Sequence, residues 1–466
     1  GTRHPAIGSR PCRGEGQWQR RGQGQGQPER VDPVPDVVVV GAGVMGASIA
    51  LETQRAGLST LVVDKGDAVG GGSTSASSAV VRFSYSTLAG VTAAWESRHR
   101  WERWTDHLGL ATSRDGAPQA RFHRVGMLFI EPPGFDRRAF LDNLEIVGVP
   151  FEVVDADDIA GLWPALDASR FWPPRLPDDE RFFDDPDGRV CGWLSPEAGF
   201  IDDPQLAALN LMDAARRHGA ELRLRTTVVG VERNGGRVAG IRIADGSTIE
   251  SPVVVNAAGP WSPQLNRLAG IEADMAITNR PLRQEVHAVG APTGFGYGDG
   301  GTMVADLDLG YYTLPQPGGS LLVGGIEADC DPLVWIGDPD ADEPTPTVSV
   351  WEAQVWRLAR RLPSLEIPLR PVGLAGHYDV TPDWVPIYDR TSLDGFYLAI
   401  GTSGNQFKNA PLVGQIMCDL ITACEGGHDH DADPVRVDCH HTGRTLDLSA
   451  FSRNRTPATT TGTVLG

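Results

Sequence analysis

The sequence is almost without lysine. Only Lys65 and Lys408 occur among its 466 residues, although lysine and arginine together number 41. Such a bias mostly reflects genome composition, so it identifies no function by itself. It does make each of the two lysines worth weighing as a functional group.

Other absences exclude whole classes of protein. No apolar run reaches the roughly 18 residues that a membrane-spanning helix needs, so no membrane span is expected. The six cysteines are scattered without a CxxC pair, which indicates free thiols in a reducing compartment. No Gly-x-Ser-x-Gly nucleophile elbow occurs. We therefore expect a cytoplasmic protein that is not a serine hydrolase of that kind.

The net charge and the length limit the class of protein and the number of domains. The net charge of −19 argues against a nucleic-acid partner and predicts a soluble acidic protein. The chain is about three times the usual domain size, so two intertwined domains or one large domain are expected. The run at residues 428–431 has ligand-type side chains, but its Gly/Asp-rich surroundings favour a solvated turn, and no metal site is expected.

Both ends read as poorly ordered. Residues 1–35 are rich in Gly, Arg, Gln and Pro without apolar periodicity, which predicts a disordered extension. An Arg-rich transit peptide, and with it an organellar matrix, is the alternative. Residues 454–466 are expected to form a loose tail.

The clearest motif lies between residues 37 and 64. Four valines are followed by the run Gly-Ala-Gly-Val-Met-Gly from Gly41 to Gly46, a helical stretch and a second apolar strand that ends at Asp64. Gly41 permits a tight turn, Gly43 lets the backbone approach a pyrophosphate, and Gly46 lets helix and strand pack closely. The helix N-terminus favours phosphates, and Asp64 would accept ribose hydroxyls. This pattern predicts a dinucleotide site.

Three later segments complete the pattern. Residues 70–79 are all Gly, Ser, Thr or Ala, which suits a loop against a flat ligand, with a flexible linker as the alternative; a helix at 88–108 is expected to follow. A buried strand at 253–256 ends in Ala-Ala-Gly, where open sheets hold ligands. A strand at 396–400 leads through a glycine-lined loop that contains Lys408 into a helix at 410–424. That setting favours a site role for Lys408 over a surface charge.

Further elements are expected between these segments. A helix at 205–218 precedes a strand at 221–224, and the Asn-Gly-Gly run at 234–236 predicts a hairpin between strands at 228–233 and 238–244.

Together these residues resemble the D-amino-acid oxidase superfamily of FAD enzymes, and within it the sarcosine oxidase and sarcosine/dimethylglycine dehydrogenase branch. The resemblance rests on the motifs above and on Thr381-Pro382-Asp383. It implies an α/β fold: a discontinuous, Rossmann-like FAD-binding domain and an α+β substrate domain on a large antiparallel sheet. The expected boundaries are 36–120, 196–280 and 371–453 for the FAD domain, and 121–195 and 281–370 for the substrate domain.

The resemblance also implies a site. Arg82 and Lys408 would hold a substrate carboxylate, and Tyr312 and Tyr378 would frame the amine, unless these tyrosines only pack. His377 is a candidate acceptor for the ammonium proton, with a structural role as the alternative. The expected cofactor residues are Gly41, Gly43, Val44, Met45, Gly46, Asp64, Lys65, Ser73, Thr74, Ser75, Ser77, Ser78, Val228, Ala258, Gly259, Trp261, Gly401, Gly404, Asn405, Gln406, Phe407 and Lys408.

Departures from the family pattern predict how this chain differs. Gly376 stands where monomeric sarcosine oxidases attach the flavin through cysteine, and residues 70–82 lack the histidine that dehydrogenase relatives use. Noncovalent FAD is therefore expected. The family's oxygen-activating lysine falls on Val323 and its nearby histidine on Glu327, which favours a dehydrogenase over an oxidase.

The predicted activity is oxidation of the C–N bond of a small amino acid or secondary or N-methyl amine, with hydride transfer to flavin. The electron acceptor would be O2 or a redox partner. Two alternatives remain: a flavin dehydrogenase of 2-hydroxy acids, and an FAD-binding subunit that works only inside a hetero-oligomer.

Overall fold

The four-valine strand lies in the middle of a six-stranded sheet. The computed structural model describes residues 34–110, 118–343 and 345–466, so the extension expected over residues 1–35 lies almost entirely outside the described residues. β1 (Val37–Val40) is buried along its length and pairs in parallel with β2 (Thr60–Val63) and β13 (Val253–Asn256). The remaining strands are β9 (Glu221–Arg223), β20 (Phe396–Ile400) and the antiparallel edge strand β19 (Ile387–Arg390), in the order β19-β20-β13-β1-β2-β9.

Helices cover this sheet. α1 (Val44–Arg55) begins within the glycine run and packs against both α6 (Pro204–Arg217) and α9 (Ala410–Glu425). The helix expected at 88–108 is interrupted at Arg103, whose φ of −111° and ψ of 43° leave the helical region. It therefore forms α2 (Leu88–Glu102) and the short α3 (Trp104–His107).

Smaller elements surround the six-stranded sheet. The hairpin predicted around residues 234–236 is present as β10 (Val228–Asn234) and β11 (Arg237–Ile243). The other small elements are β3 (Val80–Val81), β4 (Phe122–Arg124), β8 (Gly199–Ile201), β12 (Thr248–Glu250), α7 (Ser262–Ala269), β21 (Arg436–Cys439) and β22 (Arg444–Asp447).

The second large sheet has eight strands. In order they are β18 (Gly373–Val380), β14 (Arg280–Gly290), β17 (Ser320–Gly325), β16 (Tyr311–Gln316), β15 (Met303–Asp306), β5 (Met127–Ile130), β7 (Gly192–Ser195) and β6 (Glu152–Val154). All neighbouring pairs are antiparallel except β15 and β5. The sheet takes in β18, which the expected boundaries gave to the FAD domain.

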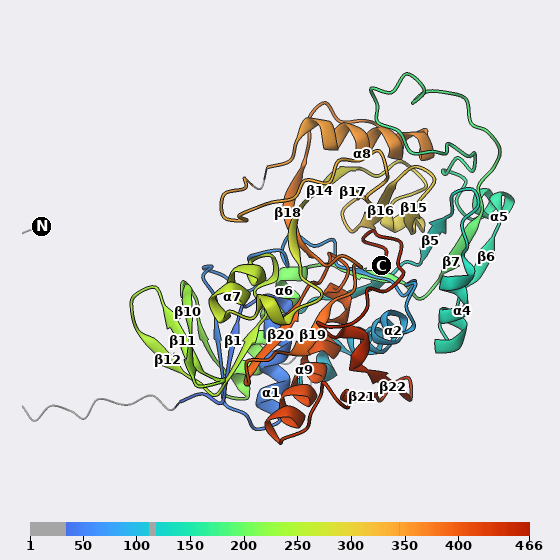
Figure 1. Ribbon diagram of the computed structural model, residues 1–466. Coiled ribbons are helices and arrows are strands. Elements are labelled where there is room, and N and C mark those ends of the chain that lie inside the picture. Colours follow the sequence, from blue (N-terminus) through green and yellow to red (C-terminus); the bar gives the residue numbers. More distant parts are fainter. Residues whose placement is uncertain (1–33, 111–117, 344) are drawn as a thin grey trace, which may run out of the picture. The chain divides into compact units, whose positions relative to one another are not determined.

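The two faces of the eight-stranded sheet pack against different parts of the chain. α8 (Val348–Arg361) lies over β14, β17 and β16, at the top of Figure 1, while α4 (Arg138–Val147) and α5 (Ala156–Leu162) lie beyond β5. Successive side chains of a strand point to opposite faces. Val323 is therefore buried among the apolar residues of α8, whereas Tyr312 points to the opposite face.

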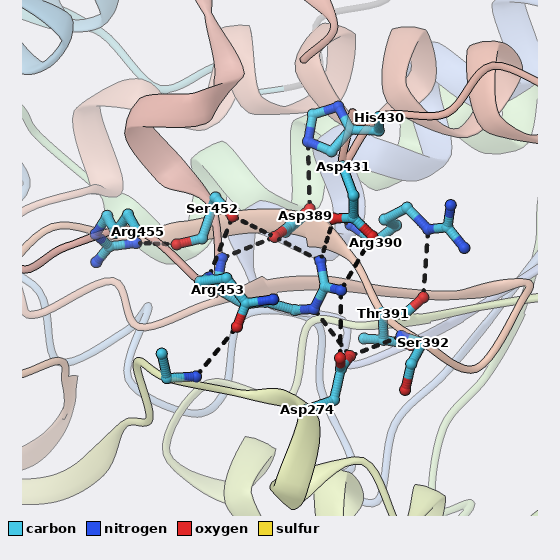
Figure 2. Close-up of polar contacts among 12 residues, drawn as sticks. Asp274, Asp389, Arg390, Thr391, Ser392, His430, Asp431, Ser452, Arg453 and Arg455 are labelled. Atoms are coloured by element: carbon cyan, nitrogen blue, oxygen red, sulfur yellow. Dashed lines mark hydrogen bonds and ion pairs between the residues drawn. The ribbon is translucent and has the colours of Figure 1, made fainter. Parts of the chain in front are cut away.

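A buried charge cluster directly precedes residues 454–466, the segment expected to be a loose tail. The Arg453 guanidinium is buried and forms ion pairs with Asp274, Asp389 and Asp431, at 2.8, 3.1 and 2.9 Å (Figure 2). His430, in the run expected to be a solvated turn, is buried against Asp389 at 3.2 Å. Within the expected tail, Arg455 forms an ion pair with Asp383 at 2.8 Å, so the beginning of that segment is also held by a charge pair that composition alone does not reveal.

Among the described residues, none of the helices combines the length and apolar character that crossing a bilayer requires.

Candidate active site

The glycine run has the geometry of a phosphate-binding turn. Gly41 has a φ of +114°, and a Cβ atom there would lie 2.3 Å from the Ala257 carbonyl oxygen. A Cβ at Gly46 would lie 1.9 Å from the Gly41 carbonyl oxygen, so helix and strand meet at backbone contact. A Cβ at Gly43 would meet only Thr74 Oγ1, at 3.2 Å. Gly43 thus leaves the backbone open at the start of α1.

Side chains from two predicted cofactor residues brace this turn. Thr74 Oγ1 accepts a hydrogen bond from Val44 N at 3.1 Å. The Asp64 carboxylate accepts from Ala42 N at 2.6 Å and from Gly66 N at 2.7 Å. Each carboxylate oxygen has a second lone pair, so Asp64 can hold the turn and still accept a ribose hydroxyl.

A cavity runs from the glycine turn to the face of the eight-stranded sheet opposite α8. Every residue expected to contact the cofactor lines it except Gly46, Ser75 and Gly401. Gly46 is covered by the Gly41 carbonyl, and Ser75 Oγ donates to Gly72 O at 2.9 Å. Gly401 N donates to Asp379 Oδ2 at 2.7 Å. These three shape the loops without facing the cavity.

One end of the cavity carries a cluster that sequence reasoning found only in part. Lys65 forms an ion pair with Asp340, and its Nζ lies 4.1 Å from the centroid of the Trp261 ring. Trp261 Nε1 donates to Asp340 Oδ1 at 2.9 Å. Asp340 was not foreseen, because nothing in the sequence relates the loop around it to Lys65, 275 residues away.

At the other end lie two buried cations. Arg82 and Lys408 are 4% and 3% exposed, and among the described residues no carboxylate lies within ion-pair distance of either. Arg82 donates to the carbonyl oxygens of Ser84 and Val464, the latter at 2.6 Å. Lys408 Nζ donates to Tyr85 Oη at 2.9 Å and to Asn405 O at 2.5 Å. A buried charge without a partner is costly, so this pair is suited to receive an anion.

The pKa of Lys408 agrees with the interpretation that an anion binds here. Burial, followed by the nearby Arg82 charge, holds the pKa of Lys408 well below its usual value. An anionic ligand beside the two groups would oppose both causes and restore the charged form of the lysine.

Tyr85 joins the two cations and was missed by sequence reasoning. Its hydroxyl donates to Asn405 O at 2.6 Å, and its ring centroid lies 4.5 Å from the Arg82 guanidinium carbon. Burial raises the pKa of Tyr85 to about 12, so the phenol stays protonated. The one signal in the sequence was its position three residues after Arg82.

The two framing tyrosines line the same cavity. Tyr312 Oη lies 2.6 Å from Ser78 Oγ, and burial raises the pKa of this tyrosine to about 12. The Tyr378 ring lies over Gly404, where a Cβ atom would be 2.3 Å from it. Gly404 is therefore needed for the tyrosine to lie across the loop that carries Lys408.

His377 also lines the cavity, but its side chain has different partners. It precedes Tyr378 on β18, so its side chain points to the opposite face of the sheet. Its Nε2 lies 2.7 Å from Asp342 Oδ2, which also accepts from Arg283 Nη1 at 2.6 Å. Asp342 thus holds one ring nitrogen of His377, and the role of this residue as acceptor of the ammonium proton stays a prediction.

Comparison with known proteins places the chain. Residues 36–420 match the family model DAO, described as FAD dependent oxidoreductase. The chain belongs to this family. As a DAO-family oxidoreductase its cofactor is FAD. The open backbone at Gly43, the start of α1 and Asp64 all line the cavity, which fits the phosphates and ribose of that cofactor.

Two relatives of this DAO-family enzyme span most of its length. FAD-dependent oxidoreductase domain-containing protein 1 of Xenopus laevis is 24% identical over 475 residues, covering 92% of this chain and 83% of the relative. Sarcosine oxidase subunit beta of Rhodobacter capsulatus is 25% identical over 398 residues, covering 83% of this chain and 84% of the relative.

Solved structures confirm the predicted fold class. L-proline dehydrogenase from P. horikoshii matches with a TM-score of 0.67 and 25% identity, over 84% of this chain and 94% of that chain. Glycine oxidase from Bacillus cereus matches with a TM-score of 0.65 and 19% identity, over 86% of this chain and 98% of that chain. The latter shows likeness of fold alone.

Proposed function

We propose that this enzyme oxidises the C–N bond of a small amino acid, with N-methylated amino acids and cyclic secondary amines as the favoured substrates. The observation that carries this proposal is that Arg82 and Lys408, two buried basic side chains at one end of the FAD cavity, have no carboxylate partner among the described residues. Similar proteins named sarcosine oxidase subunit beta and L-proline dehydrogenase support the choice of amine.

Each residue has a distinct task in this proposal. Arg82 offers a planar guanidinium that can bind a carboxylate at two points, and Lys408 adds a compact charge. Tyr312 and Tyr378 enclose the amine and exclude water. FAD, when bound, supplies the two-electron acceptor. The protein contributes mainly by holding the substrate in a reactive orientation.

The FAD is proposed to be held without a covalent bond. A Cβ atom at Gly376 would lie only 2.7 Å from Ala76 Cβ, so the position at which some relatives carry cysteine has no room for a side chain here. Acid precipitation should release the yellow flavin into the supernatant. Colour that stays in the pellet would contradict this proposal.

We further propose that the enzyme is a dehydrogenase. A fixed positive charge beside reduced flavin speeds its reaction with O2 by stabilising the developing superoxide. Lys65 is paired with Asp340, Lys408 would be occupied by the substrate carboxylate, and Val323 packs under α8. Stopped-flow reoxidation in air-saturated buffer should be much slower than turnover with an artificial acceptor; comparable rates would mean an oxidase.

A second candidate is an FAD-binding subunit that needs partner chains. The relative named sarcosine oxidase subunit beta, of which this chain covers 84%, favours it. Purified chain that binds FAD but is reduced by no substrate would support this candidate.

The main test is anaerobic mixing of the purified protein with N-methyl amino acids, prolines, D-amino acids and 2-hydroxy acids while flavin absorbance is followed. We expect bleaching by amines. Bleaching by 2-hydroxy acids alone would support the alternative dehydrogenase and overturn the proposal.

A further inference from the structure

The backbone of Val464 is held at both ends by ionisable side chains, those of Glu327 and Arg82. Its N–H donates to Glu327 Oε2 at 2.7 Å, and its carbonyl oxygen accepts from Arg82 Nη2 at 2.6 Å. Val464 and Leu465 also line the FAD cavity. A segment of the chain therefore lies at the substrate end of this cavity.

The two contacts have the spacing of an α-amino acid. The nitrogen and the carbonyl carbon of one residue are joined through a single carbon, as are the amine and the carboxylate of an α-amino acid. Arg82 is the residue to which the proposed function assigns the substrate carboxylate. The Val464 nitrogen then takes the place of the substrate nitrogen, and Glu327 is the residue that would contact it.

We propose that Glu327 binds the amine nitrogen of the substrate, so that Arg82 and Glu327 form a two-point receptor for α-amino acids, which the Val464 backbone occupies until substrate displaces it. This inference rests on the proposed function and adds both a specificity residue and a competing segment to it.

The surroundings of Glu327 support this role. Gln284, which lines the cavity, donates from Nε2 to Glu327 Oε1 at 2.8 Å and so fixes the carboxyl group. Glu327 has a φ of +53°, an uncommon backbone conformation for a residue other than glycine. Burial raises its pKa to about 8, the direction that lets a carboxyl group share a proton with an amine. The charges of Arg82 and Asp331 face the same group and act in opposite directions.

The segment that ends at Val464 is held unequally along its length. At its base Arg453 forms the ion pairs of Figure 2, and Arg455 binds both oxygens of Asp383, at 2.8 and 2.9 Å. Thr460 Oγ1 adds a bond to Asp383 O at 3.0 Å. At Val464, by contrast, the contacts to Arg82 and Glu327 are made by the backbone alone. The end lacks the ion pairs that hold the base, and substrate would have to displace the buried Val464 and Leu465 side chains and the hydrogen bond from Ser86 Oγ to Gly466 O.

Binding of two isosteric probes to the FAD-loaded protein tests the receptor. In 2-aminoisobutyrate an amine replaces one methyl group of pivalate, and neither compound has an α-hydrogen to be oxidised. Perturbation of the flavin spectrum gives both dissociation constants without turnover. We expect the unaltered protein to prefer 2-aminoisobutyrate about tenfold or more, since a buried charged contact is involved.

Glu327→Gln should remove most of that preference while pivalate binding changes little. Glu366→Gln, at an exposed glutamate, is the matched control and should keep the preference. Equal binding of the two probes by the unaltered protein, or an unchanged preference in Glu327→Gln, would overturn the receptor.

Deletion of residues 459–466 tests the competing segment. It keeps Arg453 and Arg455 but removes Val464, so both probes should bind several-fold more tightly. Unchanged binding of both would overturn the competition. If amines reduce the flavin but Glu327→Gln keeps the probe preference, the proposed function stands and this inference fails. If no amine reduces the flavin, the proposed function itself fails.

Discussion

The two ends of the FAD cavity are built by different means. At the glycine turn the contacts come from the backbone of one continuous segment, in which Gly41 and Gly46 allow strand and helix to touch. At the end proposed to bind substrate they come from side chains on distant segments, namely Arg82, Tyr312, Tyr378 and Lys408. The first end depends on the absence of side chains and the second on their presence. Substitutions should therefore act on cofactor binding at one end and on substrate binding at the other.

The largest effect is expected at the glycine turn. Gly46→Ala would place a Cβ atom 1.9 Å from the Gly41 carbonyl oxygen, so α1 and β1 must separate. Forced overpacking of this kind typically costs about 1–3 kcal/mol or more, and FAD content should fall steeply. Gly43→Ala, whose Cβ would meet only Thr74 Oγ1 at 3.2 Å, is the control that should fold normally. FAD content and melting temperature measure both; full FAD in Gly46→Ala would refute the close contact.

The next largest effect is expected on substrate binding, with little effect on FAD binding. Arg82→Ala and Lys408→Ala should weaken substrate binding about tenfold or more, because each removes a charge from a buried pair of partners. FAD content should stay near that of the unaltered protein, since neither residue braces the glycine turn. Titration of flavin reduction gives the substrate affinity. Normal turnover in both variants would show that the carboxylate is bound elsewhere.

The two ends of the cavity also differ in how well the sequence predicts them. The turn from Gly41 to Gly46 and the acceptor Asp64 were predictable because the residues needed lie within one short segment. The local setting of Lys408 indicated a site role, but its partnership with Arg82 was predictable only through the family resemblance, because 326 residues separate them, as read from their positions in the chain.

Other parts of the site could not be predicted, for identifiable reasons. Tyr85 owes its place to the loop that follows β3, and Val464 to a segment whose composition suggested disorder. The role of His377 stays a prediction, because its position in the sequence does not reveal which face of β18 its side chain occupies. Such features depend on strand register and on charge pairs between distant segments, which local patterns do not encode.

A smaller effect is expected from Tyr85→Phe. The change removes the hydroxyl that accepts from Lys408 and donates to Asn405, but keeps the ring against Arg82. A single hydrogen bond contributes about 0.5–1.5 kcal/mol, so substrate affinity should fall several-fold, less than in Lys408→Ala. Flavin titration measures it. A loss as large as that of Lys408→Ala would assign Tyr85 a direct contact with substrate.

The smallest effect is a change in the pH dependence of stability. Burial raises the pKa of Glu327 from 4.5 to about 8, so the folded chain holds a proton that the unfolded chain releases. Stability is therefore lost as the pH rises between these two values. Glu327→Gln removes this loss, and its melting temperature relative to the unaltered protein should rise from pH 5 to pH 8. A difference that does not change with pH would contradict the raised pKa.

The most direct test of the cation pair is the rate of anaerobic flavin reduction by an N-methyl amino acid and by the same amine without its carboxylate. If Arg82 and Lys408 hold the carboxylate, the amino acid should reduce the flavin at least about tenfold more efficiently, and Arg82→Ala should narrow that difference. Equal efficiency for the two compounds in the unaltered protein would contradict a carboxylate site at Arg82 and Lys408.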